Sequence, residues 1–118
     1  MTQKRILVVD DDPHIRLLYQ TELEECGYRV ETMDSAVKLL QAGPPESFDL
    51  IVLDIEMPEM TGIEALQELR KKLPDTRVVI NSAYSIYKAD FQTWLADDYL
   101  VKSSDLSELK ESIAKLLE

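Results

Sequence analysis

Two patterns of apolar residues alternate along the chain. Short runs of branched apolar residues, such as those at 6–9 and 50–53, are typical of strands that are buried on both faces. Longer stretches lie between them, in which apolar residues recur every three or four positions, as on one face of a helix. The pattern predicts five strands, at 5–9, 28–32, 50–54, 77–81 and 99–101, the second of which alternates apolar and polar residues as an edge strand would.

Capping residues and helix breakers indicate where five helices begin and end. Asp12 is suited to cap the first helix, because a short acidic side chain can accept a hydrogen bond from a free amide of the first turn. Pro13 fits the first helical position and Gly27 ends the helix. The other helices are expected to begin after Asp34 or Ser35, at 61–62, near 86, and after a cap at Asp105.

Helical spacing also predicts which side chains of these helices face the core. The expected inward residues are Ile15, Leu18, Tyr19 and Cys26 in the first helix, with Leu23 flanking, then Ala36, Val37 and Leu40 in the second, Ile63, Leu66, Leu69 and Leu73 in the third, and Leu106, Leu109, Ile113, Leu116 and Leu117 in the last. The alternation of strands and helices implies an α/β fold, a doubly wound five-stranded parallel sheet with right-handed crossovers and helices on both faces.

Composition limits the class of protein and of function. The 118 residues, 45% of them hydrophobic, suffice for one domain with a core, expected over 1–118, which is either complete or ends at a domain boundary. The net charge of −10 argues against nucleic-acid or anionic-membrane contact, which requires basic surface. No apolar stretch reaches the length of a membrane span, and we see no signal peptide. The single cysteine, Cys26, excludes an internal disulfide and suits a reducing, cytoplasmic compartment.

Two of the expected strands end on acidic residues. Asp10 and Asp11 follow the first strand, and Asp54 follows the third. In a parallel sheet both ends lie at the carboxyl edge, where open α/β folds bind ligands. We expect Asp54 to be exposed there, because burial of a lone carboxylate costs free energy. Carboxylates that gather at one edge repel one another unless a hard cation is present, and Mg²⁺ prefers such oxygen ligands.

Two further strand ends carry groups that are suited to phosphate chemistry, Ser82 after the fourth strand and Lys102 after the fifth. Each has a plain structural interpretation, since a serine at a strand end is commonly a turn residue and a lysine there is commonly solvated. The acidic run 10–12 could likewise be only a capping cluster. If the sheet is parallel, however, all these groups meet at one edge, which favours a shared site over independent accidents.

On these motifs, the sequence resembles the receiver domain of two-component response regulators over essentially its whole length. The resemblance rests on 6–11, on Asp54 with Met57-Pro58 and Gly62, on Ser82-Ala83 and on 99–102. It implies a flavodoxin-like sheet in the order 2-1-3-4-5. It also implies a phosphoryl-accepting signalling domain that catalyses its own phosphorylation and dephosphorylation and is not a multiple-turnover enzyme.

The same resemblance implies a role for each group at the carboxyl edge. Asp54 would be the phosphoryl acceptor, a carboxylate nucleophile that forms an acyl phosphate. The Mg²⁺ ligands would be Asp11, Asp10 (directly or through water), Asp54 and the backbone carbonyl of Glu56. Lys102 would contact one phosphoryl oxygen and Ser82 another. Tyr99 would swing inward behind Ser82 when the domain switches.

The phosphoryl donor implied by the resemblance is a phosphohistidine on a sensor histidine kinase or a histidine phosphotransfer protein. The output would pass to a downstream domain or protein through the surface of the fourth helix, fifth strand and fifth helix. A homodimer that forms on phosphorylation is left open. His14, the one histidine, is expected to be an exposed residue near the side where the donor docks. The sequence names neither the kinase nor the output partner.

The chain departs from the family pattern at a few positions. Ser103 stands where most receivers have a proline after the lysine, and Leu95-Ala96 stands where they have Gly-Ala. Because a non-proline cis peptide bond costs about 2.5–4 kcal/mol, we expect a trans bond before Ser103, with Lys102 still reaching the acidic residues. Glu56 and Tyr84 occupy two variable positions that tune phosphoryl lifetime in the family, and Tyr84 is expected to shield the phosphoryl group from water.

Two other functions stay open at this point. A degenerate receiver would bind a partner without phosphate, although the intact set of acidic and basic residues argues against it. A Mg²⁺-dependent phosphohydrolase of the haloacid dehalogenase class would also use Asp54 as a nucleophile. Such an enzyme needs a second aspartate two residues later, where this chain has Glu56.

Overall fold

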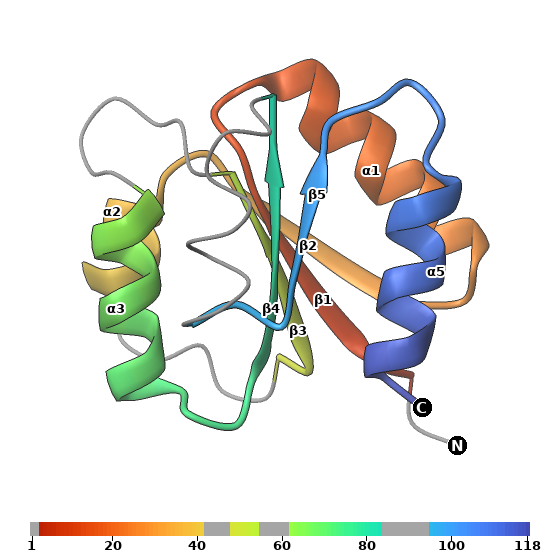
Figure 1. The fold of residues 1–118 in the computed structure, drawn as a ribbon. Helices are drawn as coiled ribbons and strands as arrows, with labels where there is room; N and C mark the ends of the chain where they lie inside the picture. Colours follow the sequence, from red (N-terminus) through yellow and green to blue (C-terminus); the bar gives the residue numbers. More distant parts are fainter. Residues whose placement is uncertain (1–2, 42–47, 55–61, 84–94) are drawn as a thin grey trace.

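The computed structural model of the chain describes residues 3–41, 48–54, 62–83 and 95–118, with helices on both faces of a central sheet (Figure 1). The strands are β1 Arg5–Val9, β2 Arg29–Met33, β3 Leu50–Leu53, β4 Arg77–Ser82 and β5 Asp98–Val101. The helices are α1 Pro13–Glu25, α2 Ala36–Gln41, α3 Gly62–Lys72 and α5 Ser107–Leu116. Every predicted strand is confirmed to within a residue, and residues 86–94 of the helix expected at 86–95 lie outside the described residues.

The strands are all parallel and lie in the order β2-β1-β3-β4-β5, which confirms the predicted fold class and strand order. At the carboxyl edge, Val9 of β1 is paired with Leu53 of β3, and Ser82 of β4 is paired with Val101 of β5. Because all five strands are parallel, the residues at their carboxyl ends are delivered to the same edge of the sheet, although β4 and β5 extend two residues beyond the ends of β1 and β3.

The alternation of side chains along the strands divides the core into two layers. Leu7 of β1 packs with Leu66 of α3 on the face that α2 and α3 cover. Ile6 packs with Tyr19 of α1 and Ile113 of α5 on the opposite face. Figure 1 shows these two pairs of helices on opposite sides of the sheet. Residues of both layers are almost fully buried, so the sheet is covered on both faces as the apolar strands predict.

Side-chain caps start the first two helices. The Oδ1 atom of Asp12 accepts a hydrogen bond from the backbone N–H of His14 at 2.8 Å, and the proline follows at the start of α1. The hydroxyl of Ser35 accepts a hydrogen bond from the N–H of Lys38 at 3.3 Å, so Ser35 is the residue that caps α2. These contacts confirm that short polar side chains set the two helix starts.

The start of α5 differs from the prediction. Leu106 is its N-cap residue and has no side-chain capping bond, so the assignment of that position to Asp105 was wrong. The Asp105 carboxylate still holds the first turn from one residue further out, because its Oδ1 atom accepts the backbone N–H of Ser107 at 2.9 Å and its hydroxyl at 2.6 Å. These hydrogen bonds lower the pKa of Asp105.

The predicted inward face of α1 is confirmed at Ile15 and Tyr19 and was wrong at Leu18 and Cys26. Tyr19 and Leu23 are the buried residues of this helix, whereas Leu18 is 41% exposed and Cys26 is exposed. Residues four apart share one helical face, so the stripe that contains Tyr19 and Leu23 excludes Leu18. Cys26 is the C-cap residue, and Gly27 after it takes a φ of +97°, which directs the chain away from the helix axis.

The remaining helices agree better with their predicted faces. Leu66 and Leu69 of α3 and Leu109 and Ile113 of α5 are buried, while α2 buries Leu39 where its neighbour was expected. None of the helices in the described ranges is long and apolar enough to cross a membrane.

Candidate functional site

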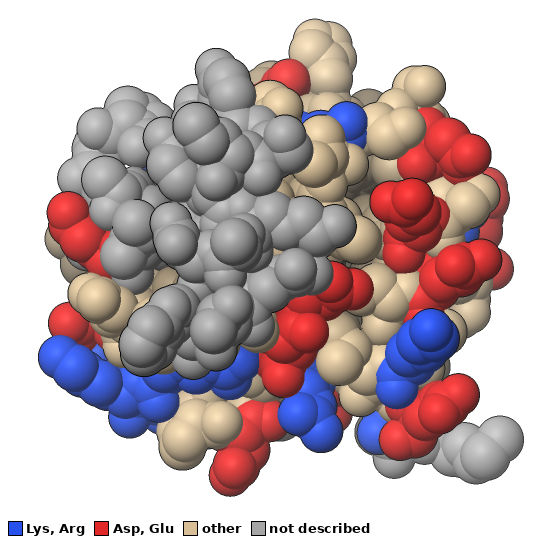
Figure 2. All heavy atoms as spheres, in the orientation of Figure 1, with Lys and Arg blue, Asp and Glu red and all other residues tan. Residues whose placement is uncertain are grey.

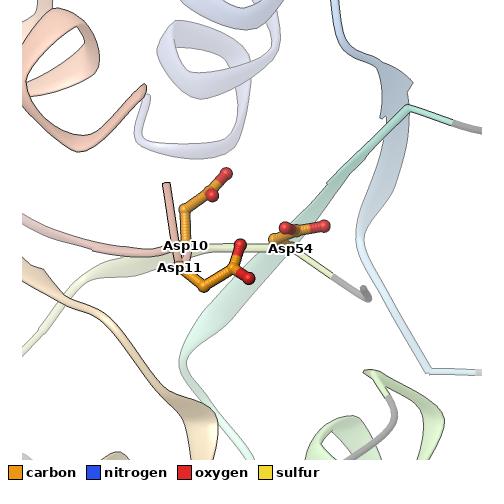
Figure 3. Close-up of side chains that lie close together, drawn as sticks. All are labelled: Asp10, Asp11 and Asp54. Carbon is orange, nitrogen blue, oxygen red and sulfur yellow. The ribbon is translucent and has the colours of Figure 1, made fainter. Parts of the chain in front are cut away.

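Three carboxylates converge at the carboxyl edge of the sheet (Figure 3). Asp10 and Asp11 follow β1, Asp54 follows β3, and one carboxylate oxygen of each lies within 4.8 Å of the other two. The two strand ends are held level here, because the backbone N–H of Asp54 donates to the carbonyl of Val9 at 2.9 Å. The predicted meeting of these residues is confirmed.

Burial of the three carboxylates is unequal. Asp10 is 2% exposed and Asp54 is 3% exposed, whereas Asp11 is exposed to solvent. The expectation that Asp54 would be exposed was therefore wrong. A buried carboxylate is tolerated only if it is paired or hydrogen-bonded, so the burial of Asp54 requires a partner. The position of Asp54 at a strand end does not by itself reveal that partner.

Lys102 supplies that partner. Its ammonium nitrogen lies 2.8 Å from Oδ2 of Asp10 and 3.3 Å from Oδ2 of Asp54. Burial by itself lowers the pKa of Lys102, but the hydrogen bond to Asp10 and the charge of Asp54 outweigh this effect and raise the pKa above its ordinary value. The lysine is therefore charged and stands between the two buried carboxylates.

The turn after β1 is fixed by hydrogen bonds to Asp10. Its Oδ1 atom accepts the backbone N–H of Asp12 at 2.9 Å, and its carbonyl oxygen accepts a hydrogen bond from Nη1 of Arg16 at 2.7 Å. Asp11 lies between the two ends of this turn. The backbone that carries the exposed carboxylate of Asp11 is thus held in place by the side chain of Asp10 and by Arg16 of α1.

Ser82 and Tyr99, the residues expected to switch, are both fully buried. Ser82 ends β4, and its carbonyl accepts the backbone N–H of Lys102 at 2.6 Å. Tyr99 packs into the core layer on the α2 and α3 side. Their movements on phosphorylation stay predictions, and the predicted tuning residues Glu56 and Tyr84 lie outside the described residues.

The connection from β5 to α5 has the geometry expected from its sequence. The described residues contain no cis peptide bond, so the bond between Lys102 and Ser103 is trans. The hydroxyl of Ser103 accepts the backbone N–H of Asp105 at 3.1 Å within this loop. Lys102 nevertheless reaches the acidic residues, so both parts of that prediction are confirmed.

Sequence reasoning missed a buried polar pair beside this site. The side-chain amide of Asn81 on β4 donates a hydrogen bond to the phenol oxygen of Tyr19 on α1. Both residues are almost fully buried, and together with Lys102 they line a cavity of about 300 Å³. Burial raises the pKa of Tyr19, although the bond from Asn81 opposes this rise. The available signal was a lone asparagine at the end of the apolar run 78–80.

Comparison with known proteins identifies the family. The sequence model of the response regulator receiver domain matches residues 6–114. The chain belongs to this family. A similar solved structure is TrrA from Thermotoga maritima in complex with Mg²⁺-BeF, which is 45% identical with a TM-score of 0.87 over 97% of this chain and 99% of that one. TrrA in complex with the histidine kinase ThkA gives 46% identity and a TM-score of 0.89 over 98% and 100%.

Curated relatives of this receiver domain are longer proteins. The transcriptional regulatory protein ZraR of Klebsiella oxytoca is 35% identical over 117 residues, which cover 98% of this chain and 26% of that protein. The probable transcriptional regulator ycf27 of Cyanophora paradoxa is 37% identical over 120 residues, which cover 99% and 49%. The chain therefore spans between about a quarter and a half of the length of these relatives.

The three carboxylates of the receiver domain suit a small hard cation. Mg²⁺ binds oxygen at about 2.0–2.1 Å in octahedral geometry, so neighbouring ligands lie about 3 Å apart and opposite ligands about 4.2 Å apart. One carboxylate oxygen each of Asp10, Asp11 and Asp54 lies within 4.8 Å of the other two, so an inward movement of these side chains would bring them onto one ion. The donor set therefore fits Mg²⁺ in its chemistry, and its three residues are close enough to share one ion.

Proposed function

We propose that this receiver domain accepts a phosphoryl group on Asp54. The observation that carries the proposal is the Lys102 ammonium, which lies 3.3 Å from the Asp54 carboxylate and 2.8 Å from that of Asp10. It supplies a fixed positive charge beside a carboxylate that follows the central strand of the sheet. Phosphoryl transfer depends mainly on positioning and on neutralisation of charge, and this arrangement offers both.

The donor in this proposal is a phosphohistidine of a sensor histidine kinase or of a histidine phosphotransfer protein. A carboxylate oxygen of Asp54 attacks the phosphorus atom, and an O–P bond forms as the P–N bond to the imidazole breaks. The imidazole leaves with the electron pair of that bond, and Asp54 becomes an acyl phosphate. Lys102 would then contact one phosphoryl oxygen, and the hydroxyl of Ser82 would donate a hydrogen bond to another.

Asp10, Asp11 and Asp54 would hold Mg²⁺, and the family resemblance adds the backbone carbonyl of Glu56 as a further ligand. The ion, when bound, neutralises negative charge on the carboxylates and the phosphoryl oxygens. Support comes from the spacing of the three carboxylates and from the TrrA structure, which is a complex with Mg²⁺-BeF. The residues of this chain would hold the acceptor oxygen at the end of β3 and the ammonium at the end of β5, on the same edge of the sheet.

A histidine kinase is the proposed input partner. The solved complex of ThkA with TrrA, which is 46% identical to this chain, supports that assignment. His14 is exposed, as expected, in the first turn of α1 close to the acidic turn. It takes no part in the chemistry of the proposed transfer.

The proposed output is a downstream domain or protein that reads the surface of the fourth helix, β5 and α5, with a phosphorylation-dependent homodimer as one form of it. The relatives that are transcriptional regulators and longer than this chain support an output of this kind.

Figure 2 shows Lys and Arg side chains gathered near the C-terminal end of α3, where Arg70, Lys71 and Lys72 lie, and acidic side chains over α5. With a net charge of −10, this chain itself is not proposed to bind nucleic acid.

The protein is a signalling domain, and we propose that it resets itself by hydrolysis of its own acyl phosphate without acting as a multiple-turnover enzyme. The lifetime of the phosphoryl group would depend on Glu56 and Tyr84, as the resemblance implies. The cytoplasmic location expected from the sequence stays a prediction.

Incubation with Mg²⁺ and acetyl phosphate, followed by intact-mass measurement and a phosphate-release assay, tests the proposal. We expect one phosphate on the wild-type chain and none in the presence of a chelator. The absence of any adduct would indicate a binding module that works without phosphate. Release of many phosphates per protein without a stable adduct would indicate a phosphohydrolase, and either result would overturn the proposal.

A further inference from the structure

The hydrogen bond between Tyr19 and Asn81, here called the Tyr19–Asn81 pair, joins α1 to β4 behind the carboxyl edge. Its neighbours in this core layer are apolar, among them Leu23 and Val79. A polar group that is buried among apolar side chains costs free energy unless it is hydrogen-bonded. Two apolar side chains of similar shape could replace both partners at little cost in stability, so the presence of two matched polar groups calls for a reason.

Lys102 lies next to this pair. The side chains of Tyr19 and Asn81 line the same 300 Å³ cavity as Lys102. Asn81 is followed by Ser82, whose carbonyl accepts the backbone N–H of Lys102. The charges of Lys102, Asp10 and Asp54 also act on the phenol of Tyr19, so the pair lies within electrostatic reach of the site.

The cavity offers the lysine a second set of partners. Asp105 and Glu108 line it as well, and both are exposed acidic residues. Lysine is a flexible side chain with four carbons before its ammonium, so the chain from Lys102 could direct its charge either to Asp10 and Asp54 or into the cavity. The structure shows the first of these arrangements.

We propose that the Tyr19–Asn81 pair is a positioning device for Lys102, a rigid polar wall that holds the lysine stem toward Asp10 and Asp54 and away from the cavity. Rotation of either side chain would break the hydrogen bond between them, so the bond opposes the opening of a path for the ammonium. In this role the pair contacts neither the phosphoryl donor nor the acceptor Asp54, and it acts only through Lys102. The consequence for phosphoryl transfer rests on the proposed function of Asp54, whereas the placement of Lys102 does not.

The test uses Tyr19→Phe, Asn81→Leu and the double variant. Replacement of both hydrogen-bonding partners by apolar groups can be nearly neutral for stability, so the double variant is expected to melt close to wild type. Gln20→Leu is the matched control, because Gln20 also joins α1 to the sheet, through a 3.4 Å bond to the carbonyl of Val30, but does not line the cavity.

The first readout is the NMR signal of the Lys102 ammonium protons. In wild type and in Gln20→Leu we expect slow exchange with water, as for a held ammonium. In the double variant we expect a signal that exchanges as fast as those of exposed lysines. An unchanged Lys102 signal in a folded double variant would show that the pair serves packing alone. If the double variant fails to fold, Tyr19→Phe, which keeps the ring, gives the same comparison.

The second readout is the limiting rate of phosphorylation by acetyl phosphate. Displacement of a catalytic group by about 1 Å can cost up to about a hundredfold in rate, and we expect a loss of about tenfold in the double variant. The same substitutions made in a Lys102→Met background should cause no further loss, since residues that act through one partner are not additive. An equal loss in both backgrounds would overturn the inference. If wild type takes up no phosphate, the proposed function fails, and the NMR readout still decides this inference.

Discussion

The ammonium of Lys102 lies 2.8 Å from Oδ2 of Asp10, a carboxylate that is only 2% exposed. The lysine follows β5 at the edge of the sheet, and the aspartate follows β1. The same ammonium contacts Asp54 at 3.3 Å, so one internal cation serves two buried carboxylates. A metal ion that enters the site has to share the two carboxylates with Lys102, and a phosphoryl group that enters it meets the Lys102 ammonium.

Lys102→Met should destabilise the protein in the absence of Mg²⁺. Removal of one partner from a buried ion pair costs about 3–5 kcal/mol, and we expect the lower end of that range because the Lys102 side chain is 22% exposed. Chemical denaturation in the presence of a chelator measures the change. The control is Lys110→Met, which removes a more exposed 3.6 Å pair with Glu22 and should cost no more than about 1 kcal/mol. Equal stability of the Lys102 variant and wild type would contradict this account of the site.

Mg²⁺ should raise the melting temperature of the wild-type chain, and Ca²⁺ or Mn²⁺ should be able to replace it. A ligand that binds only the folded state stabilises it by about 2.7 kcal/mol at a hundredfold excess over Kd. Asp11→Ala should abolish the effect, because it removes the exposed carboxylate of the cluster. Asp75→Ala, a change at an exposed acidic residue away from the cluster, should leave it intact. A melting temperature that does not respond to millimolar Mg²⁺ would count against a metal site.

Arg70→Ala should be strongly destabilising. The Arg70 guanidinium donates to the carbonyls of Leu95 and Thr76 at 2.6 and 2.7 Å and to Asp97 at 2.7 Å, so it anchors the segment that leads into β5. We expect a loss of about 3–5 kcal/mol, which Arg70→Lys should not recover because an ammonium cannot reproduce the planar fork.

The matched control for this network is Arg77→Ala. Arg77 contacts the same Asp97 at 3.4 Å, but its side chain is 54% exposed, and its loss should cost less than about 1 kcal/mol. Urea denaturation of both variants gives the comparison. Similar losses for the two arginines would show that the three hydrogen bonds of Arg70 do not carry the stability assigned to them.

The free energy of unfolding should fall at alkaline pH, because the raised pKa values of Tyr19 and Lys102 both act in that direction. The pKa of Tyr19 is raised above its ordinary value of 10.0 and that of Lys102 above 10.5, so the folded state holds both protons more tightly than the unfolded state does. Their contribution is complete below those values and is lost as the pH rises through the raised folded-state values. Denaturation curves at pH 8 to 11 should show a shallower decline in Tyr19→Phe than in wild type. An equal decline in both would rule out a part for Tyr19.

The fold could be predicted because its signals are local. The apolar runs of β1 and β3 identify buried strands, and alternation with helices makes those strands parallel, so the meeting of Asp10 and Asp54 followed from the sequence. The exact inward stripe of α1 did not follow, because Leu18 and Tyr19 are neighbours that can each pack in a core, and only the packing against the sheet buries the second and not the first.

The residues that form the site could be predicted from the sequence, but which of their charges contact one another could not. Lys102 was expected at the same edge as the carboxylates, but its pairing with Asp10 depends on distances between β1 and β5, which are not neighbours in the sheet. The burial of Asp54 depends on its own contact with Lys102, which explains why its exposure was predicted wrongly. The bond between Tyr19 and Asn81 joins residues 62 apart in sequence, beyond the reach of any spacing rule.

The most direct test of the central proposal is the location of the phosphoryl group. After treatment with acetyl phosphate and Mg²⁺, borohydride reduces an aspartyl phosphate to homoserine, which peptide mass mapping places in the chain. We predict homoserine at position 54 in wild type and none in Asp54→Asn, a variant that should stay folded because the amide is nearly isosteric and relieves repulsion with Asp10 and Asp11. Homoserine at position 10 or 11, or undiminished phosphate uptake by Asp54→Asn, would contradict the assignment of Asp54 as the acceptor.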